Sequence, residues 1–487
     1  GQALGRRQQF EHASCHVRAC CENPVLRVLA ISRGGAHDRW VAYNFVSADR
    51  SQRFLLPPDM ADWLPEDHLA WFVIDVVDQI DLDRFRRVYR ADGHGRPAYD
   101  PAVMVALLLY AYCSGVRSSR VIERRCVEDV AFRVLAGNLC PDHVTIARFR
   151  SRHADALAEV FIDSLRLCAE VGLVRLGVVA LDGTKIGSDA SVDANRTLVE
   201  LTKTVSEMLA EAEATDLAED EDPPADPTPK QLAGRAERLD RLNAAKDRLE
   251  TKAAERAHRF EERTRASNET RAAKGLAPRE FRPRPRSEAP QPNAVANVTD
   301  PESRLLRGRG GPVQGYNAQA ACTADQVIVA AEVTQAANDV EQLAPMLAAT
   351  NTTLAEAGIA ARPETLVADA GYWRIENVNG SIPNAPELFI AVAKHARRGK
   401  PRKDGSPSAS TSDVFVAAMK AKLKSDRGGD MMRMRRTTIE PVFGHIKDVR
   451  GARRFSRRGL DAAQAEWQLL CAAHNLTKLW RFQTRPA

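Results

Sequence analysis

The sequence lacks any apolar run long enough to cross a membrane. Its longest apolar stretch, residues 102–112, is far shorter than the roughly 20 residues that a transmembrane helix needs. The N-terminus also lacks a basic segment followed by an apolar one, so no secretory signal is visible. We therefore expect a protein without membrane spans that acts in the cytoplasm.

Paired cysteine motifs are missing as well. The nine cysteines are an odd number, and six of them stand singly in apolar segments, as reduced core thiols do. These are Cys113, Cys126, Cys140, Cys168, Cys322 and Cys471. A cluster from His12 to Cys21 has no second pair at zinc-finger spacing. We therefore predict no zinc site.

Acidic residues are scarce near the C-terminus. The net charge of +6 is small, but basic residues gather there, and between Arg433 and Arg458 only Glu440 and Asp448 are acidic. A carboxylate in such a segment is expected to be neutralised. Its presence therefore indicates that Glu440 has a specific role.

The chain of 487 residues is too long for one compact core. Residues 1–54 show no sustained period and are predicted to form a poorly ordered tail. Residues 55–172 have apolar residues at helical spacing and form a predicted helical domain. Residues 197–300 form a charged helical insertion, whose Pro- and Arg-rich part, residues 279–292, is predicted to be disordered. Residues 173–196 and 301–482 form the remaining core.

Arginines on two predicted helices of the 55–172 domain have two possible interpretations. Arg120 follows the start of one helix, and Arg148 and Arg150 lie on another. They could form a DNA-binding module or a solvated helix face, and helical spacing alone does not distinguish these.

The core has the pattern of an α/β fold. Short apolar, β-branched runs predict five strands in the core, and apolar residues at helical spacing predict two helices. A tight turn predicts that the second and third strands form a hairpin. The predicted strands are residues 176–181, 314–323, 326–334, 364–371 and 388–392, and the predicted helices are residues 339–358 and 414–423. This order, with the insertion after the first strand, is ribonuclease-H-like. The first and fourth strands of that fold lie adjacent and parallel, which would bring Asp182 and Asp369 together at matching strand ends.

These carboxylates form the predicted metal site. Asp189, Asp193, Asp300, Asp325 and Asp339 are rivals, but only Asp182 and Asp369 end short apolar runs. Two neighbouring carboxylates repel each other unless they share a cation, and Mg²⁺ prefers such oxygen ligands. Glu440 would add a third carboxylate. Two such ions, about 3.5–4 Å apart, support phosphoryl transfer.

Basic residues around Glu440 fit a phosphate-bearing substrate. Arg436 and Lys447 lie four residues before and seven residues after Glu440, which would place all three on one helix face. Pro441 leaves open whether the helix instead begins at Glu440. Arg450, Arg453 and Arg454 could bind further phosphates, although a solvated basic face is the simpler interpretation.

Four blocks of the sequence resemble bacterial insertion-sequence transposases of the DDE type. They are Leu181-Asp182-Gly183-Thr184-Lys185, Gly315-Tyr316-Asn317-Ala318-Gln319, Val367-Ala368-Asp369-Ala370-Gly371-Tyr372 and the segment from Arg436 to Lys447. Residues 56–90 and 141–149 resemble the InsH-type N-terminal domain of these proteins. The resemblance covers residues 55–480 and implies that Asp182, Asp369 and Glu440 are the catalytic, metal-binding triad. The resemblance also implies that Arg436 and Lys447 belong to the signature around the glutamate. Relatives in the wider group carry a tyrosine three residues before this arginine, where this chain has Arg433.

The resemblance implies a transposase that cleaves DNA at the ends of its element and transfers the strand by attack of a 3′-OH. The expected cofactor is Mg²⁺ or Mn²⁺, as two ions. The expected partners are the terminal inverted repeats, the target DNA and a second subunit in a homodimer, in a nucleoid-associated location. A nuclease of the same fold and a transposase-derived DNA-binding protein without activity are alternatives. A coiled-coil scaffold, suggested by the charged helices alone, is opposed by the strand blocks.

Overall fold

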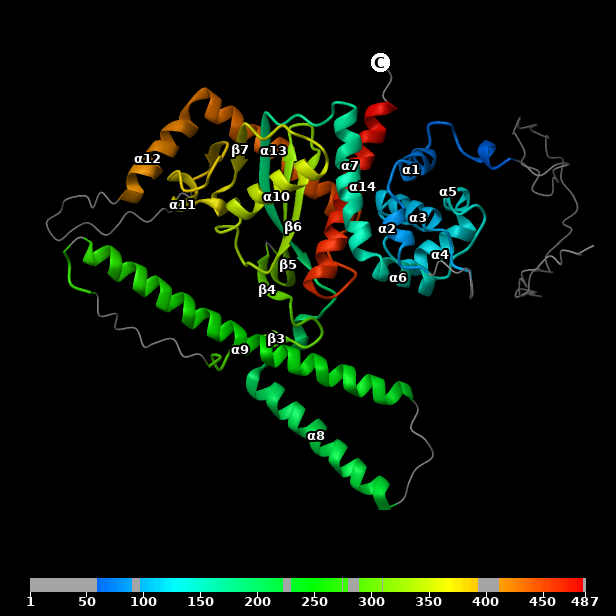
Figure 1. Cartoon of the computed structure of the whole chain (residues 1–487), viewed down its shortest axis with the longest axis horizontal. Helices are drawn as coiled ribbons and strands as arrows, with labels where there is room; N and C mark the ends of the chain where they lie inside the picture. The colour runs from blue at the N-terminus through cyan, green and yellow to red at the C-terminus, as the bar shows by residue number, and fades with distance from the viewer. Residues whose placement is uncertain are drawn as a thin grey trace, which may run out of the picture. The chain divides into compact units, whose positions relative to one another are not determined.

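The computed structural model of the chain describes residues 59–89, 97–221, 229–273, 275–278, 289–308, 310–392 and 411–484 (Figure 1). The predicted tail, residues 1–54, lies outside the described residues, as does most of the Pro- and Arg-rich part of the insertion. No helix in the described part of the chain combines the length and the apolar character that crossing a bilayer requires.

The N-terminal part is helical, as predicted. After a short 3-10 turn, Met60–Trp63, its helices are α1 (Leu69–Asp78), α2 (Asp83–Arg86), α3 (Pro101–Cys113), α4 (Ser119–Glu128), α5 (Val130–Leu135), α6 (His143–Arg152) and α7 (Ala154–Glu170). The side chain of Asp100 caps α3 by accepting from the N–H of Ala102 at 2.8 Å, and Pro101 fits the first turn. The short helix α5 was not predicted. Asp129 starts it by accepting from the N–H of Ala131 at 2.9 Å.

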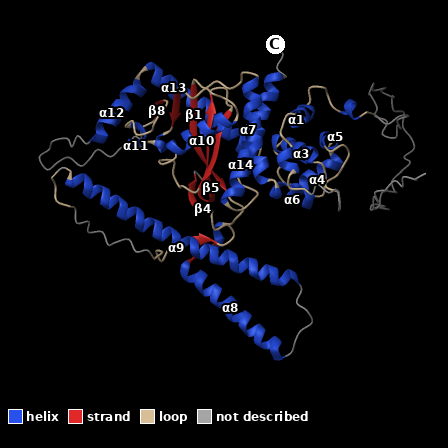
Figure 2. Ribbon diagram, in the orientation of Figure 1, coloured by secondary structure: helices blue, strands red, loops and turns tan. Residues whose placement is uncertain are grey.

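A mixed sheet forms the core, and α7 and α14 (Leu460–Gln483) lie beside it in Figure 2. Its strands are β1 (Val178–Gly187), β4 (Arg304–Gly308), β5 (Gly311–Thr323), β6 (Ile328–Thr334), β7 (Thr365–Ala368) and β8 (Glu387–Ile390). β5 pairs antiparallel with β1 on one side, and with β4 and then β6 on the other. β1 pairs parallel with β7, and β7 with β8. The predicted hairpin and the predicted parallel pairing of the first and fourth strands are both confirmed.

The first strand is longer than predicted. The sequence predicts that it ends at Asp182, but β1 continues to Gly187, because its antiparallel partner β5 is long enough to pair with it throughout. Its parallel partner β7 stops at Ala368, opposite Leu181. Asp182 therefore lies just beyond the end of β7, where β1 has no parallel partner strand among the described residues. The site forms at this opening beside β1.

The insertion consists of two long helices, α8 (Leu198–Glu221) and α9 (Pro229–Ala272). The strands β2 (Asn195–Thr197) and β3 (Val295–Asn297) pair antiparallel at its base. Leu201 of α8, Leu249 of α9 and Ala296 of β3 belong to one small apolar cluster. The charged helical insertion therefore has a small apolar core at its base.

The helices that follow β6 in the chain pack on the sheet and on one another. They are α10 (Leu343–Glu356), the short α11 (Ile375–Val378), α12 (Thr411–Lys424), α13 (Asp426–Gly444) and α14 (Leu460–Gln483). α13 continues through Pro441 and passes into a π-helical turn, His445–Val449. Arg436 and Glu440 therefore share one helix, which settles the alternative that Pro441 had left open. α14 is mostly buried, contacting α3, α7 and β6.

Candidate active site

Asp182, on β1, lies beside Asp369, which directly follows the parallel strand β7. Leu181 pairs with Ala368, and each aspartate is the next residue of its chain segment. Burial, followed by repulsion from Asp369, raises the pKa of Asp182 to about 6, against the opposing effect of Arg435. Asp369 accepts from the N–H of Gly371 at 2.7 Å and so caps a 3-10 turn, Ala370–Tyr372. The structure thus brings together two of the three predicted carboxylates.

A third aspartate, Asp339, belongs to the same site. Its Oδ1 accepts from Asn317 Nδ2 and Gln319 Nε2, each at 2.7 Å, and lies 3.6 Å from Lys185 Nζ. Asn317 and Gln319 share one face of β5, since strand side chains alternate. Sequence reasoning treated Asp339 only as a rival. The signal that identifies it is the pair of amide side chains two residues apart on β5.

Gly183 makes room for this arrangement. A Cβ atom at Gly183 would lie 2.2 Å from Gln319 Nε2 and 2.6 Å from Asp339 Oδ1. The amide and the carboxylate therefore rest directly on the backbone of β1, beside Asp182. A side chain at position 183 would displace them.

The side chain of Arg435 lies between Glu440 and Asp182 and bonds to both. Arg435 donates from Nη1 to Asp182 Oδ2 at 2.8 Å and from Nη2 to Glu440 Oε1 at 3.4 Å. The Glu440 side chain is 52% exposed, whereas that of Arg435 is 13% exposed. Arg435 faces inward because it lies one helical turn before the buried Ile439. Arg436, the arginine that the sequence predicts, is exposed instead.

Lys447 also reaches the site. Its Nζ donates to Thr184 Oγ1 at 2.5 Å, two residues along β1 from Asp182. Lys185, on the opposite face of β1, lies among acids. Its pKa is lowered, because burial lowers it by more than the charges of Asp339, Asp182 and Asp369 raise it. Three cationic side chains, those of Lys185, Arg435 and Lys447, therefore surround the carboxylates.

The donor set fits a hard divalent cation in its chemistry. All the acidic groups offer oxygen ligands. Burial and the charge of Asp369 raise the pKa of Asp182 and so oppose its ionisation in the absence of a positive charge. Among the described residues, no three histidine, cysteine, aspartate or glutamate side chains are gathered as a ligand set. Arg435, and not Glu440, is the group in contact with Asp182. In this arrangement a guanidinium supplies the positive charge.

The basic segment after Lys447 serves packing as well as charge. Arg450 is only 2% exposed and donates from Nη2 to Ala473 O and Thr477 Oγ1 of α14. The prediction that Arg450 contacts phosphates is therefore wrong in this conformation. Arg454 donates to the carbonyls of Ser188 and Ala190 at 2.6 and 2.7 Å, beyond the end of β1. Arg453 is exposed and pairs with Asp448.

A groove of about 800 Å³ lies between the N-terminal helices and this segment. Arg120 of α4 and Arg148 of α6 line it and are exposed, and Arg454 lines the other side. Arg150 lines it too, but its Nη1 donates to the carbonyl of Arg117 at 2.8 Å. Arg150 therefore contributes mainly to holding α6 against the start of α4, while Arg120 and Arg148 are available to a ligand.

Two family models match the chain. Residues 58–152 match a transposase domain, DUF772, and residues 406–480 match a transposase DDE domain. The second match contains Glu440 and Lys447, whereas Asp182 and Asp369 lie outside both matches. No curated protein and no solved structure matches the chain.

Proposed function

We propose that the chain is an insertion-sequence DDE transposase, as its two family matches support, and that it cleaves DNA at the ends of its element and transfers the freed strands to target DNA. The observation that carries this proposal is the juxtaposition of Asp182 and Asp369 at the opening beside β1. Glu440 on α13 is the proposed third acid, linked to Asp182 through Arg435.

We further propose that the sheet is a ribonuclease-H-like core. The strand order, β6 and β4 beside β5, then β1, β7 and β8, supports this assignment, as does the parallel pairing of β1 with β7. The insertion leaves the core between β1 and β4, and its ends are joined by the pairing of β2 with β3. A long insertion can therefore be accommodated without separating the paired strands of the core.

Asp182, Asp369 and Glu440 would hold Mg²⁺ or Mn²⁺, as two ions. In phosphoryl transfer, such ions activate the attacking oxygen and stabilise the leaving oxygen. The chain's own residues prepare the site. Asn317 and Gln319 hold Asp339 in place, and Lys447 fixes the side chain of Thr184 on β1. Arg435 keeps Asp182 and Glu440 oriented toward each other across the gap between β1 and α13.

The proposed substrate is double-stranded DNA, as terminal repeats and as target. Exposed Arg120 and Arg148, which line the groove between the N-terminal helices and the core, are proposed phosphate contacts, as are Arg436 and Arg453. Arg454 would assist from the opposite wall. A homodimer on the DNA and association with the nucleoid complete the proposal.

The test is a cleavage assay on DNA that carries the ends of the element, with the purified full-length protein. Asp182→Asn, Asp369→Asn and Glu440→Gln should each abolish Mg²⁺-dependent strand cleavage and leave the affinity for DNA within about twofold, since no DNA contact is removed. Asp193→Asn, at an exposed aspartate outside the site, is the matched control. Full cleavage by any of the three variants would remove that residue from the triad. DNA binding by the wild type without cleavage would favour a transposase-derived binding protein.

A further inference from the structure

The insertion helix α9 carries a continuous basic face. Its residues are Arg248, Lys252, Arg256, Arg259 and Arg263, spaced four, four, three and four residues apart. That spacing places them on one side of the helix. The adjacent apolar positions, including Leu242 and Leu249, are buried at the base of the insertion. The packing of α9 therefore fixes the direction in which its basic face points.

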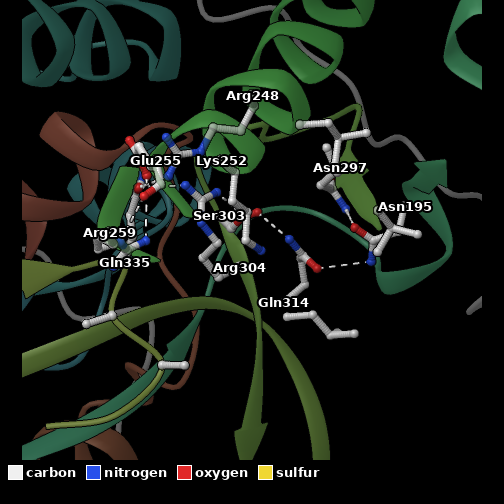
Figure 3. Close-up of a pocket in the computed structure, with 16 residues that line it drawn as sticks. Asn195, Arg248, Lys252, Glu255, Arg259, Asn297, Ser303, Arg304, Gln314 and Gln335 are labelled. Carbon is white, nitrogen blue, oxygen red and sulfur yellow. Dashed lines mark hydrogen bonds and ion pairs between the residues drawn. The ribbon is translucent and has the colours of Figure 1, made fainter. Parts of the chain in front are cut away.

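This face forms one wall of a pocket of about 460 Å³ (Figure 3). Arg248, Lys252 and Arg259 line the pocket from α9, and Arg304 lines it from β4. Among the described residues that line it, Glu255 is the one carboxylate, and its Oε2 lies 3.9 Å from Arg259 Nη2. Four cationic side chains thus share one acidic neighbour.

Two guanidinium groups converge on a single neutral acceptor in this pocket. Arg248 Nη2 and Arg304 Nη2 donate to the same oxygen, Gln335 Oε1, at 2.7 and 2.6 Å. Desolvation, and then the nearby Arg248 and Arg256, lower the pKa of Lys252. Arg304 also donates from Nη1 to the carbonyls of Pro301, Glu302 and Ser303, whereas the buried Nε of Arg248 finds no acceptor. The converging positive charges still repel one another, and an anion in the pocket would relieve that repulsion.

The shape of the basic face indicates a polyanion. A second hollow of about 250 Å³ continues along α9, lined by Arg256, Arg259, Phe260 and Arg263. Arg259 lines both hollows. At a rise of 1.5 Å per residue, the distance from Arg248 to Arg263 is about 22 Å, which is long enough to contact several phosphates of one DNA strand. A single free phosphate would need only one of these positions.

The pocket adjoins the segment that carries an acid of the site. Ala336 and Ala337 line it, and Asp339 follows two residues later. Arg263 Nη2 lies 4.0 Å from Glu341 Oε1, in the same segment. We propose that this basic groove of α9 binds the phosphate backbone of the DNA that enters the carboxylate site. The proposal rests on the proposed function, because it assumes a DNA substrate.

A charge-matched pair of variants tests the proposal. Lys252→Glu/Arg259→Glu removes two cations of the groove. Arg238→Glu/Arg265→Glu makes the same change in net charge at exposed positions of α9 that do not line either hollow. Binding of a fluorescein-labelled random-sequence duplex to the full-length protein would be measured by anisotropy over a range of salt concentrations. The groove variant should bind at least about 10-fold more weakly, with a salt dependence reduced by about two ions, while the control changes less than about twofold.

Each outcome decides the matter. Equal weakening by both pairs would show a general charge effect and overturn the groove. A second outcome is that the wild type binds DNA and cleaves it in an Asp182-dependent way while the groove variant keeps the same affinity for DNA. That result would overturn the proposal for the groove and leave the proposed function intact. A wild type that binds no DNA would defeat both. Tight binding of inorganic phosphate that is lost in the groove variant, with unchanged DNA binding, would assign the pocket to a free anion and overturn the proposal.

Discussion

Arg435 and Asp182 are joined by a hydrogen bond of 2.8 Å between Nη1 and Oδ2, although 253 residues separate them in the chain. The bond connects helix α13 to the strand β1 at the point where β7 ends. The other nitrogen of the same guanidinium, Nη2, reaches Glu440. One cationic group therefore relates two of the proposed catalytic acids, and it offsets part of the repulsion between Asp182 and Asp369.

Arg435→Gln should impair cleavage far more than Arg436→Gln. Without the guanidinium, the side chains of Asp182 and Glu440 are no longer held in place by a shared hydrogen-bond donor. Mg²⁺-dependent cleavage should therefore fall about 10- to 100-fold, as it does when residues that orient metal ligands are changed. Arg433 is exposed on the same helix, where it pairs with Asp430, and Arg433→Gln serves as the matched control. Arg436→Gln removes a proposed phosphate contact, so its cleavage rate is compared at saturating DNA. Cleavage rates at several Mg²⁺ concentrations would measure the effect. Similar rates for Arg435→Gln and the wild type would exclude a positioning role for Arg435.

The choice between Arg435 and Arg436 shows what the sequence could not provide. Residue spacing places Arg436 and Glu440 one turn apart, and the helix that they share does exist. Which side of α13 faces the sheet depends on the burial of Ile439 and Val442, which is a result of tertiary packing. The arginine that meets Asp182 is therefore set by contacts between segments far apart in the chain.

The strands were more predictable than the side chains around them. Their apolar, β-branched runs and the tight turn of the hairpin are local properties, and so the pairing of β1 with β7 followed from the order of the elements. The burial of Arg450 was not predictable, because its acceptors, Ala473 and Thr477, lie on another helix. Asp339 could be identified only once Asn317 and Gln319 were seen to bind it.

Gly183→Ala should destabilise the site, although it adds only a methyl group. The new Cβ would lie 2.2 Å from Gln319 Nε2, so the amide and Asp339 must move. We expect a loss of about 1–3 kcal/mol in the free energy of unfolding, together with reduced cleavage. Gly177→Ala is the control, since a Cβ there meets nothing within 4 Å. Urea denaturation of both variants measures the difference. Equal free energies of unfolding for the two variants would mean that Gln319 and Asp339 can move aside at little energetic cost.

Lys447 and Thr184 should be energetically coupled. The ammonium group donates to the hydroxyl at 2.5 Å and ties the π-helical turn after α13 to β1. Lys447→Met, Thr184→Val and the double variant form a cycle, whose coupling free energy should be about 1–2 kcal/mol, since the donor is charged. Replacing Thr184 by Val keeps the shape of the side chain. Additive effects of the two substitutions on unfolding would show that the bond contributes nothing measurable.

The raised pKa of Asp182 predicts a pH dependence of stability in the absence of divalent ions. Because burial and Asp369 raise this pKa from 3.8 to about 6, the native state holds the proton more tightly than the unfolded chain. The stability from this group is therefore complete below pH 3.8 and is lost as the pH rises through about 6. Asp182→Asn cannot ionise and should be more stable than the wild type near pH 8, by at most about 3 kcal/mol, with a smaller difference near pH 4.

The measurement of this difference also tests the proposed metal site. Urea denaturation in EDTA, at pH values on both sides of about 6, gives the free energy of unfolding of both proteins, and a difference independent of pH would contradict the raised pKa. Added Mg²⁺ should then stabilise the wild type near pH 8, because a cation that binds the ionised pair favours the native state. It should leave Asp182→Asn almost unchanged, since that variant keeps only one of the two adjacent carboxylates. Equal stabilisation of both proteins by Mg²⁺ would place the ion away from Asp182.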